Sequence, residues 1–136
     1  MKKVLIILTI LFLNFAYSQE DLVAKGFKAY ESGDYINAIK YYKQACDLNN
    51  GFGCFSLGFI YGDGLGVKKD NFKAVELYQK ACILNNGFGC SNLGLMFALG
   101  KGVRKDTSKA LEYFGKACDL KNDLGCQAYA KLKEQF

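Results

Sequence analysis

The stretch "QACDLNNGFGC" runs from Gln44 to Cys54. It returns as "KACILNNGFGC" from Lys80 to Cys90 and as "KACDLKNDLGC" from Lys116 to Cys126. Each copy starts 36 residues after the one before it, and each holds two cysteines eight residues apart. A fixed period of this length is typical of a solenoid, in which one supersecondary unit is stacked repeatedly. The repeated phrase therefore predicts a repeat architecture.

The residues on either side of the phrase extend the repeat. Leu57–Cys82 aligns without a gap with Leu93–Cys118, and Lys25–Cys46 aligns with four residues missing from its loop. Cys126–Phe136 matches only the beginning of a unit. We expect one repeat domain over residues 19–136, with units at about 19–50, 51–86 and 87–122 and a capping helix at 123–136.

Each unit is predicted to be a pair of helices, and the chain contains no proline to interrupt them. Apolar residues recur at helical spacing in the second helix of a unit, at Ala74, Val75, Leu77, Tyr78, Ala81 and Cys82. Asp70 and Asp106 stand at the expected N-cap positions. The first helix is expected from about Phe52 to Tyr61.

Glycines mark two further features of each unit. Gly58 and Gly94 lie inside the first helices, where glycine costs about 1 kcal/mol relative to alanine, so we expect a close helix contact at these positions. The loops "GDGLGV" and "ALGKGV" carry glycines at 64, 66, 100 and 102, which suit left-handed turn conformations. A phosphate-cradling loop is the alternative, but the G-x-x-x-x-G-K-[ST] arrangement is missing.

The first 18 residues are predicted to be a secretory signal that is removed. Lys2 and Lys3 precede an apolar run from Val4 to about Ala16, and small residues follow at the positions that a signal peptidase reads. A membrane span is the alternative, but the run is shorter than the ~20 residues that cross a bilayer. We expect cleavage after Ser18 and a mature protein that is secreted or periplasmic, without a membrane span.

The charge of the chain does not suggest a nucleic-acid partner. The full chain has 18 basic and 13 acidic residues, and removal of the two lysines of the signal lowers its net charge from +5 to +3. No block of five like charges is present. We therefore expect no nucleic-acid binding.

The six cysteines are predicted to form three disulfides. In each phrase the first cysteine ends a second helix, turn residues follow, and the next cysteine begins the following first helix. Antiparallel helices that pack about 8–10 Å apart bring these positions together, so the predicted pairs are Cys46–Cys54, Cys82–Cys90 and Cys118–Cys126. A metal site is the alternative. Zinc motifs usually have C-x₂₋₄-C spacing, often with histidine, and this chain has C-x₇-C and no histidine. We expect no metal and no cofactor.

The pattern L-G-x-x-[YF]…G-x-G-V-x-K-D…K-A-x-E-[LY]-[YF]-x-K-A-C resembles the Sel1-like repeat, a relative of the tetratricopeptide repeat. The paired cysteines resemble those of the secreted cysteine-rich Sel1-like proteins of Helicobacter and its relatives. The resemblance covers nearly all of residues 19–136. It implies an all-α fold, a right-handed α/α superhelix with first helices along its concave face. It also implies a functional label, since family members are described as penicillin-binding proteins or slow β-lactamases and as host-interacting secreted factors.

No known hydrolase constellation accompanies that label. A serine β-lactamase usually carries S-x-x-K, but the third residues after Ser32, Ser56, Ser91 and Ser108 are Tyr35, Phe59, Gly94 and Leu111. Histidine is absent and all cysteines are paired in the predicted scheme. No catalytic residue is assigned, and any cleavage of β-lactams is expected to be slow. Whether the chain is an enzyme stays open.

A binding groove is the preferred hypothesis. By the family's geometry, the inner face carries Phe52, Phe55, Ser56, Phe59, Phe88, Ser91, Asn92, Leu95 and Gln127, with Lys131 beyond them. Such a strip of aromatic residues with interleaved polar groups can bury and orient a ligand. Alternatively, these phenylalanines pack between helices as core. Ser56, Asn92 and Gln127 are preferred, because a polar residue inside an apolar stretch needs a partner.

Three functions therefore stay open. The first is a secreted module that binds a peptide or protein and that, as the family resemblance implies, faces the host. The second is a binder or slow hydrolase of β-lactams and, by analogy, of peptidoglycan fragments. The third is a structural scaffold. A monomer is expected in each case.

Overall fold

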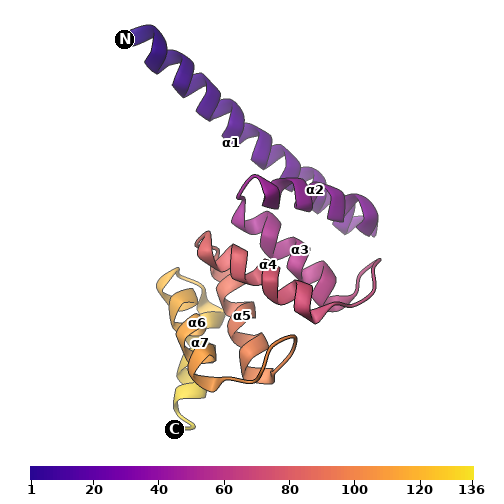
Figure 1. The fold of residues 1–136 in the computed structure, drawn as a ribbon, viewed down its shortest axis with the longest axis vertical. Helices are drawn as coiled ribbons and strands as arrows, with labels where there is room; N and C mark the ends of the chain where they lie inside the picture. The colour runs from indigo at the N-terminus through magenta and orange to yellow at the C-terminus, as the bar shows by residue number, and fades with distance from the viewer.

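The computed structural model describes all 136 residues, which form seven α-helices and no strand. Each helix packs against the next one along the chain, and the helix pairs succeed one another from the N-terminus to the C-terminus (Figure 1). The predicted all-α solenoid is confirmed. The helices are α1 Lys2–Glu31, α2 Tyr35–Asp47, α3 Gly51–Asp63, α4 Asn71–Ile83, α5 Gly87–Leu99, α6 Thr107–Asp119 and α7 Asp123–Lys133.

Side-chain caps fix where the helices begin. The predicted N-caps are confirmed, since Asp70 and Asp106 accept hydrogen bonds from the backbone N–H groups of Lys73 and Lys109, at 2.9 and 3.0 Å. The first helices have caps of their own, made by the asparagines of the repeated phrase, Asn50, Asn86 and Asn122. The same phrase therefore ends one helix and starts the next.

Glycine allows the two helices of a unit to approach closely. A Cβ atom built on Gly58 would lie 2.9 Å from the ring of Tyr78, and one built on Gly94 would lie 2.7 Å from the ring of Phe114. The expected close contact is thus confirmed. The loop glycines also behave as predicted, because Gly64 and Gly100 end their helices in the left-handed conformation, at φ 66° and 68°.

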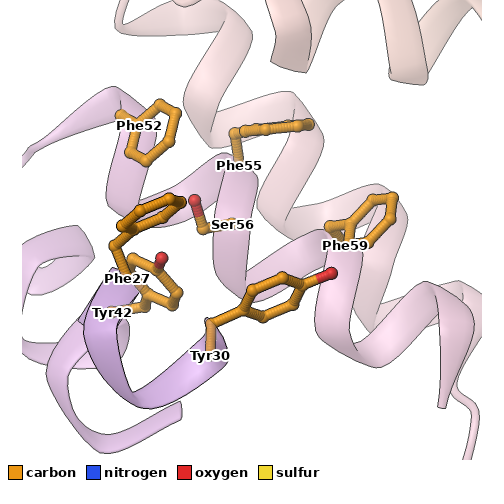
Figure 2. Close-up of a pocket in the computed structure, with 7 residues that line it drawn as sticks. All are labelled: Phe27, Tyr30, Tyr42, Phe52, Phe55, Ser56 and Phe59. Carbon is orange, nitrogen blue, oxygen red and sulfur yellow. The ribbon is translucent and has the colours of Figure 1, made fainter. Parts of the chain in front are cut away.

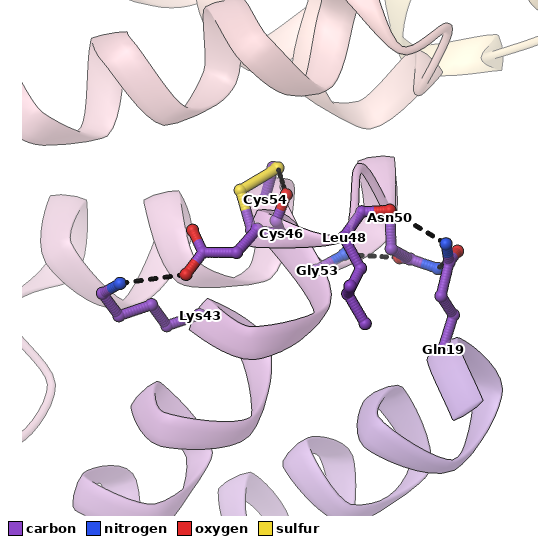
Figure 3. Close-up of a disulfide and its surroundings, with 8 residues drawn as sticks. Gln19, Lys43, Cys46, Leu48, Asn50, Gly53 and Cys54 are labelled. Atoms are coloured by element: carbon purple, nitrogen blue, oxygen red, sulfur yellow. Dashed lines mark hydrogen bonds and ion pairs between the residues drawn. A yellow bond between two sulfur atoms is a disulfide. The ribbon is translucent and has the colours of Figure 1, made fainter. Parts of the chain in front are cut away.

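Disulfides join each second helix to the first helix of the next unit. The three bonds are the predicted ones, and each joins Cα atoms 4.5 Å apart (Figure 3 shows the first bond): Cys46–Cys54, Cys82–Cys90 and Cys118–Cys126. In Figure 3, Asn50 caps α3 and also donates to the Gln19 side chain at 3.4 Å. Gln19 in turn donates to the Leu48 carbonyl at 2.9 Å. Gln19 thereby fastens α1 to the first hairpin.

The long helix α1 has two different halves. Residues 1–15 are exposed throughout, and this part extends away from the rest of the molecule (Figure 1). By length and composition α1 is apolar enough to cross a membrane, and its apolar window lies near the N-terminus. Beyond Gln19 the helix packs against α2 and contains the buried Gly26. Only this second half contributes to the solenoid.

The first helices form the inner layer of the superhelix. Helix α3 contacts α5 and α5 contacts α7, whereas α2, α4 and α6 have no comparable contact with one another. Since the first helices are closer together than the second helices, the stack curves toward the first helices. The inner layer is therefore the concave side.

Candidate functional site

Two adjoining pockets lie on the inner layer, and Phe59 lines both of them. The first, which we call the aromatic pocket, has a volume of about 190 Å³ and lies between α1, α2 and α3 (Figure 2). Ser56 lies in the middle of its labelled residues in Figure 2. Its lining is apolar apart from hydroxyl groups, and consists of Phe27, Tyr30, Tyr42, Phe52, Phe55, Ser56 and Phe59.

The second pocket, which we call the polar pocket, lies one unit further along. Its volume is about 160 Å³, and it lies between α3, α4, α5 and the glycine loops that follow α3 and α5. One wall is apolar and is formed by Phe59 with Leu95, Met96 and Leu99. The rest carries charged and hydrogen-bonding groups, namely Asp63, Lys69, Asn71, Tyr78, Asn92 and Lys101.

The two pockets occupy equivalent places in the repeat. Tyr42 aligns with Tyr78, Ser56 aligns with Asn92, and each of the four lines its own pocket. The polar pocket differs because Gly62 stands where the first unit has Tyr30. A Cβ atom built on Gly62 would lie 3.4 Å from the hydroxyl of Tyr78, so the missing side chain leaves space beside the phenol.

The buried tyrosines are paired with the polar residues that the sequence picks out. Burial raises the pKa of the Tyr42 phenol, and a hydrogen bond from Ser56 acts in the opposite direction. Burial raises the pKa of Tyr78 to about 12, the negative charge of Asp63 adds to this rise, and a hydrogen bond from Asn92 opposes it. Both phenols are therefore neutral at physiological pH and can donate a hydrogen bond.

The next unit supports an intramolecular role for these pairs. At the next repeat position, Phe114 aligns with Tyr42 and Tyr78. Ala128 likewise aligns with Ser56 and Asn92, so the hydroxyl of the tyrosine and the polar group opposite it are replaced together. Ser56 thus has the Tyr42 phenol of the preceding second helix as a polar neighbour in the aromatic pocket. Ser56 is also buried, at 9% exposure. Asn92 differs from it, since it also lines the polar pocket.

Phe55 links the second unit to the third as well as lining the aromatic pocket. Its ring stacks on Phe88 of α5 with centroids 5.4 Å apart and lies 6.2 Å from the ring of Tyr78. It also packs against the buried cores of both units. Phe55 therefore both packs between helices and lines the aromatic pocket.

The structure brings together only part of the residue set selected from the sequence. The aromatic pocket contains Phe52, Phe55, Ser56 and Phe59, and the polar pocket contains Asn92 and Leu95 together with Phe59. Neither pocket is lined by Phe88, Ser91 or Gln127.

Sequence reasoning missed the pocket residues outside the predicted strip, which are Phe27, Tyr30, Tyr42, Gly62, Asp63, Lys69, Asn71, Tyr78, Met96, Leu99 and Lys101. Alignment of the units contains a signal for some of them. Phe27 falls on Phe59, and Tyr42 falls on Tyr78.

The pockets lack the residue arrangements that activate a serine or cysteine nucleophile. No cysteine is free, and the serine of the aromatic pocket has neither a lysine nor a carboxylate among its pocket neighbours. A serine nucleophile requires an adjacent base. The polar pocket has charged side chains but no serine, threonine or cysteine.

Comparison with known proteins places the chain in a family. Residues 25–50, 51–86 and 88–122 match the Sel1 repeat. The Helicobacter pylori protein named "Putative beta-lactamase HcpC" is 48% identical over 50 residues, which are 37% of this chain and 17% of that protein. The chain thus matches less than a fifth of the length of this relative.

Solved structures agree with this placement. Helicobacter pylori cysteine rich protein B is 36% identical with a TM-score of 0.65, over 80% of this chain and 95% of that one. The Sel1 repeat protein from Oxalobacter formigenes has a TM-score of 0.77 at 24% identity, over 81% of this chain and 45% of that one. The disulfides and the cysteine-rich relatives indicate an extracellular or periplasmic location. The protein belongs to the Sel1 repeat family and is related to the cysteine-rich proteins of Helicobacter.

Proposed function

We propose that the protein is an exported binding module that holds its ligand in the aromatic and polar pockets of the inner layer. The observation that carries the proposal is that these pockets adjoin at Phe59 on the concave side. Concave surfaces are where solenoid proteins bind their partners. A mostly apolar site with a few convergent polar groups is also the usual form of a ligand pocket.

Export is proposed to occur through cleavage after Ser18. The exposed apolar part of α1 makes no contribution to the solenoid, and Gln19 makes the first long-range hydrogen bonds of the chain. Mass spectrometry of the protein produced by a bacterium with a general secretion pathway tests this. We expect an N-terminus at Gln19, and a mature protein that retains residues 1–18 would contradict the proposal.

A peptide or a segment of a protein is the first candidate ligand. Sel1 repeats generally serve protein interaction, and the pockets offer apolar volume beside hydrogen-bonding groups. A β-lactam or a peptidoglycan fragment is the second candidate, favoured by the names of the Helicobacter relatives. For the second candidate we propose binding with slow turnover, since Ser56 lacks a base. Efficient steady-state turnover of a chromogenic β-lactam would contradict this.

Selection from a displayed peptide library, together with a labelled-penicillin binding assay, tests the location of binding. Phe59→Ala removes the wall that both pockets share. Phe72→Ala is the matched control, because Phe72 belongs to a second helix and is 66% exposed. We expect Phe59→Ala to weaken binding at least about tenfold, the effect of losing roughly 1.4 kcal/mol of contact. Equal binding by both variants would show that the ligand does not bind in these pockets.

A further inference from the structure

We propose that the two pockets together recognise an acid that carries an aromatic ring, with the ring in the aromatic pocket and a single carboxylate in the polar pocket. This inference rests on the proposed function and specifies its ligand chemistry.

The aromatic pocket has the size and lining for a ring. Its volume is about 190 Å³, and no charged side chain lines it. A cavity of roughly 150 Å³ with an apolar lining is large enough to accept benzene. The rings of Phe27, Phe52 and Phe59 offer faces and edges for the offset or edge-on packing that aromatic pairs prefer.

The polar pocket is rich in donors. Lys69 and Lys101 each carry three ammonium donors and no acceptor, and Asn92 adds an amide donor. Tyr78 adds a phenol that stays protonated. These groups line one pocket together with the apolar side chains of Phe59, Leu95, Met96 and Leu99, and the two lysines are exposed. Such a donor set suits an anionic oxygen ligand, since hydrogen bonds to a charged acceptor are the strong ones.

The charge balance selects one negative charge. Two lysines and one carboxylate, that of Asp63, line the polar pocket, so its lining has an excess of one positive charge. A monoanionic carboxylate neutralises this excess. A dianionic phosphate would exceed it, and Asp63 would repel its two charges more strongly than the single charge of a carboxylate.

Gly62 sets the access to this carboxylate position. The first unit carries Tyr30 at the equivalent place and lines its own pocket with a ring instead. In the second unit, the missing side chain leaves space beside the Tyr78 hydroxyl, where a Cβ atom would lie at 3.4 Å. Gly62 is therefore the residue that separates the specificity of the polar pocket from that of the aromatic pocket.

Because Phe59 lines both pockets, the ring and the carboxylate of one small ligand can occupy them together. A peptide ending in Phe-Gly has both groups, and so does benzylpenicillin. The shared chemistry is a ring joined through an amide-containing spacer to a carboxylate.

Calorimetric titration with N-acetyl-Phe-Gly and with its C-terminal amide tests the inference. We expect the acid to bind the mature, disulfide-bonded protein at least about tenfold more tightly than the amide. The double variant Lys69→Gln with Lys101→Gln should abolish this preference, because it lowers the affinity for the acid toward that for the amide. N-acetyl-Ala-Gly should bind more weakly than N-acetyl-Phe-Gly. Equal binding of acid and amide, or a preference that survives the double variant, would overturn the inference.

The outcomes separate this inference from the proposed function. If library peptides bind at Phe59 without dependence on a carboxylate, the proposed function stands and the carboxylate site is wrong. If no tested ligand depends on Phe59, both are wrong. Competition by benzylpenicillin, measured against N-acetyl-Phe-Gly, distinguishes the sources: mutual displacement shows that both acids use one site, and its absence assigns the site to the peptide acid alone.

Discussion

Removal of the central disulfide should lower the free energy of unfolding by about 4 kcal/mol. The double variant Cys82→Ala with Cys90→Ala opens a ring of nine residues, as follows from the sequence separation of 8. In the chain-entropy treatment, a ring of this length contributes about 2.5 kcal/mol. The two sulfurs are also buried, at 2% and 0% exposure. If each counts as a buried methylene, their loss adds about 1.5 kcal/mol.

The C-terminal disulfide provides a matched control. Cys118 and Cys126 have the same sequence separation of 8, so the entropic contribution is the same. Both residues are only partly buried, so little packing is lost with them. Cys118→Ala with Cys126→Ala should therefore cost about 2.5 to 3 kcal/mol, and the difference between the two double variants measures the packing of the central sulfurs.

Urea unfolding followed by circular dichroism gives both values by linear extrapolation. Losses below about 1 kcal/mol for both double variants would refute the reasoning, because the ring length alone predicts more. A larger loss at the C-terminal bond than at the central bond would refute the packing argument. The C-terminal bond, whose cysteines are only partly buried, should also be the first to react with dithiothreitol in the native protein, since thiol attack requires access to a sulfur atom.

Three further predictions concern single residues. Gly58→Ala should destabilise the protein, because the added Cβ atom would lie 2.9 Å from the Tyr78 ring. Gly62→Ala should stabilise it by up to about 1 kcal/mol, because the added Cβ atom makes ordinary contacts at 3.4 Å and alanine favours a helix over glycine. Thermal unfolding of the two variants compares these effects. Asp70→Ala should cost about 1 kcal/mol in urea unfolding, because it removes the cap bond to the N–H of Lys73. Stability should fall as the pH rises from about 10 to about 12, because the unfolded chain releases the Tyr78 proton near the ordinary pKa of 10.0 and the folded protein holds it to about 12. This shift corresponds to about 2 to 3 kcal/mol, and a Tyr78→Phe variant that loses stability just as steeply over this range would contradict it.

The features that repeat at a fixed spacing could be predicted from the sequence. Because the period of 36 residues superimposes the cysteines, the loop glycines and Asp70 with Asp106, each assignment in one unit is checked by the others. The disulfide pairs followed from the same logic, since a cysteine at each side of a short turn has a partner within reach. The close contact at Gly58 could be predicted because a glycine inside a helix needs a reason.

The composition of the pockets could not be predicted in the same way. Pocket residues come from two successive units and from the loops between helices, so helical spacing along one helix does not identify them. Lys69 and Lys101 follow turn glycines, and nothing in their spacing places them beside Asn92. Nothing in the helical spacing places Ser56 beside Tyr42, which lies 14 residues earlier in the chain and lines the same pocket.

Chemical-shift mapping with ¹⁵N-labelled mature protein tests most directly whether the inner layer is the binding face. On titration with N-acetyl-Phe-Gly, the account predicts shifts that centre on the backbone N–H of Gly62, the side-chain amide of Asn92 and the neighbours of Phe59. The backbone around Ile83, which is exposed at the C-terminal end of α4 and lines neither pocket, should not respond. Shifts that centre on the second helices, or an unchanged spectrum at saturating ligand, would contradict the account.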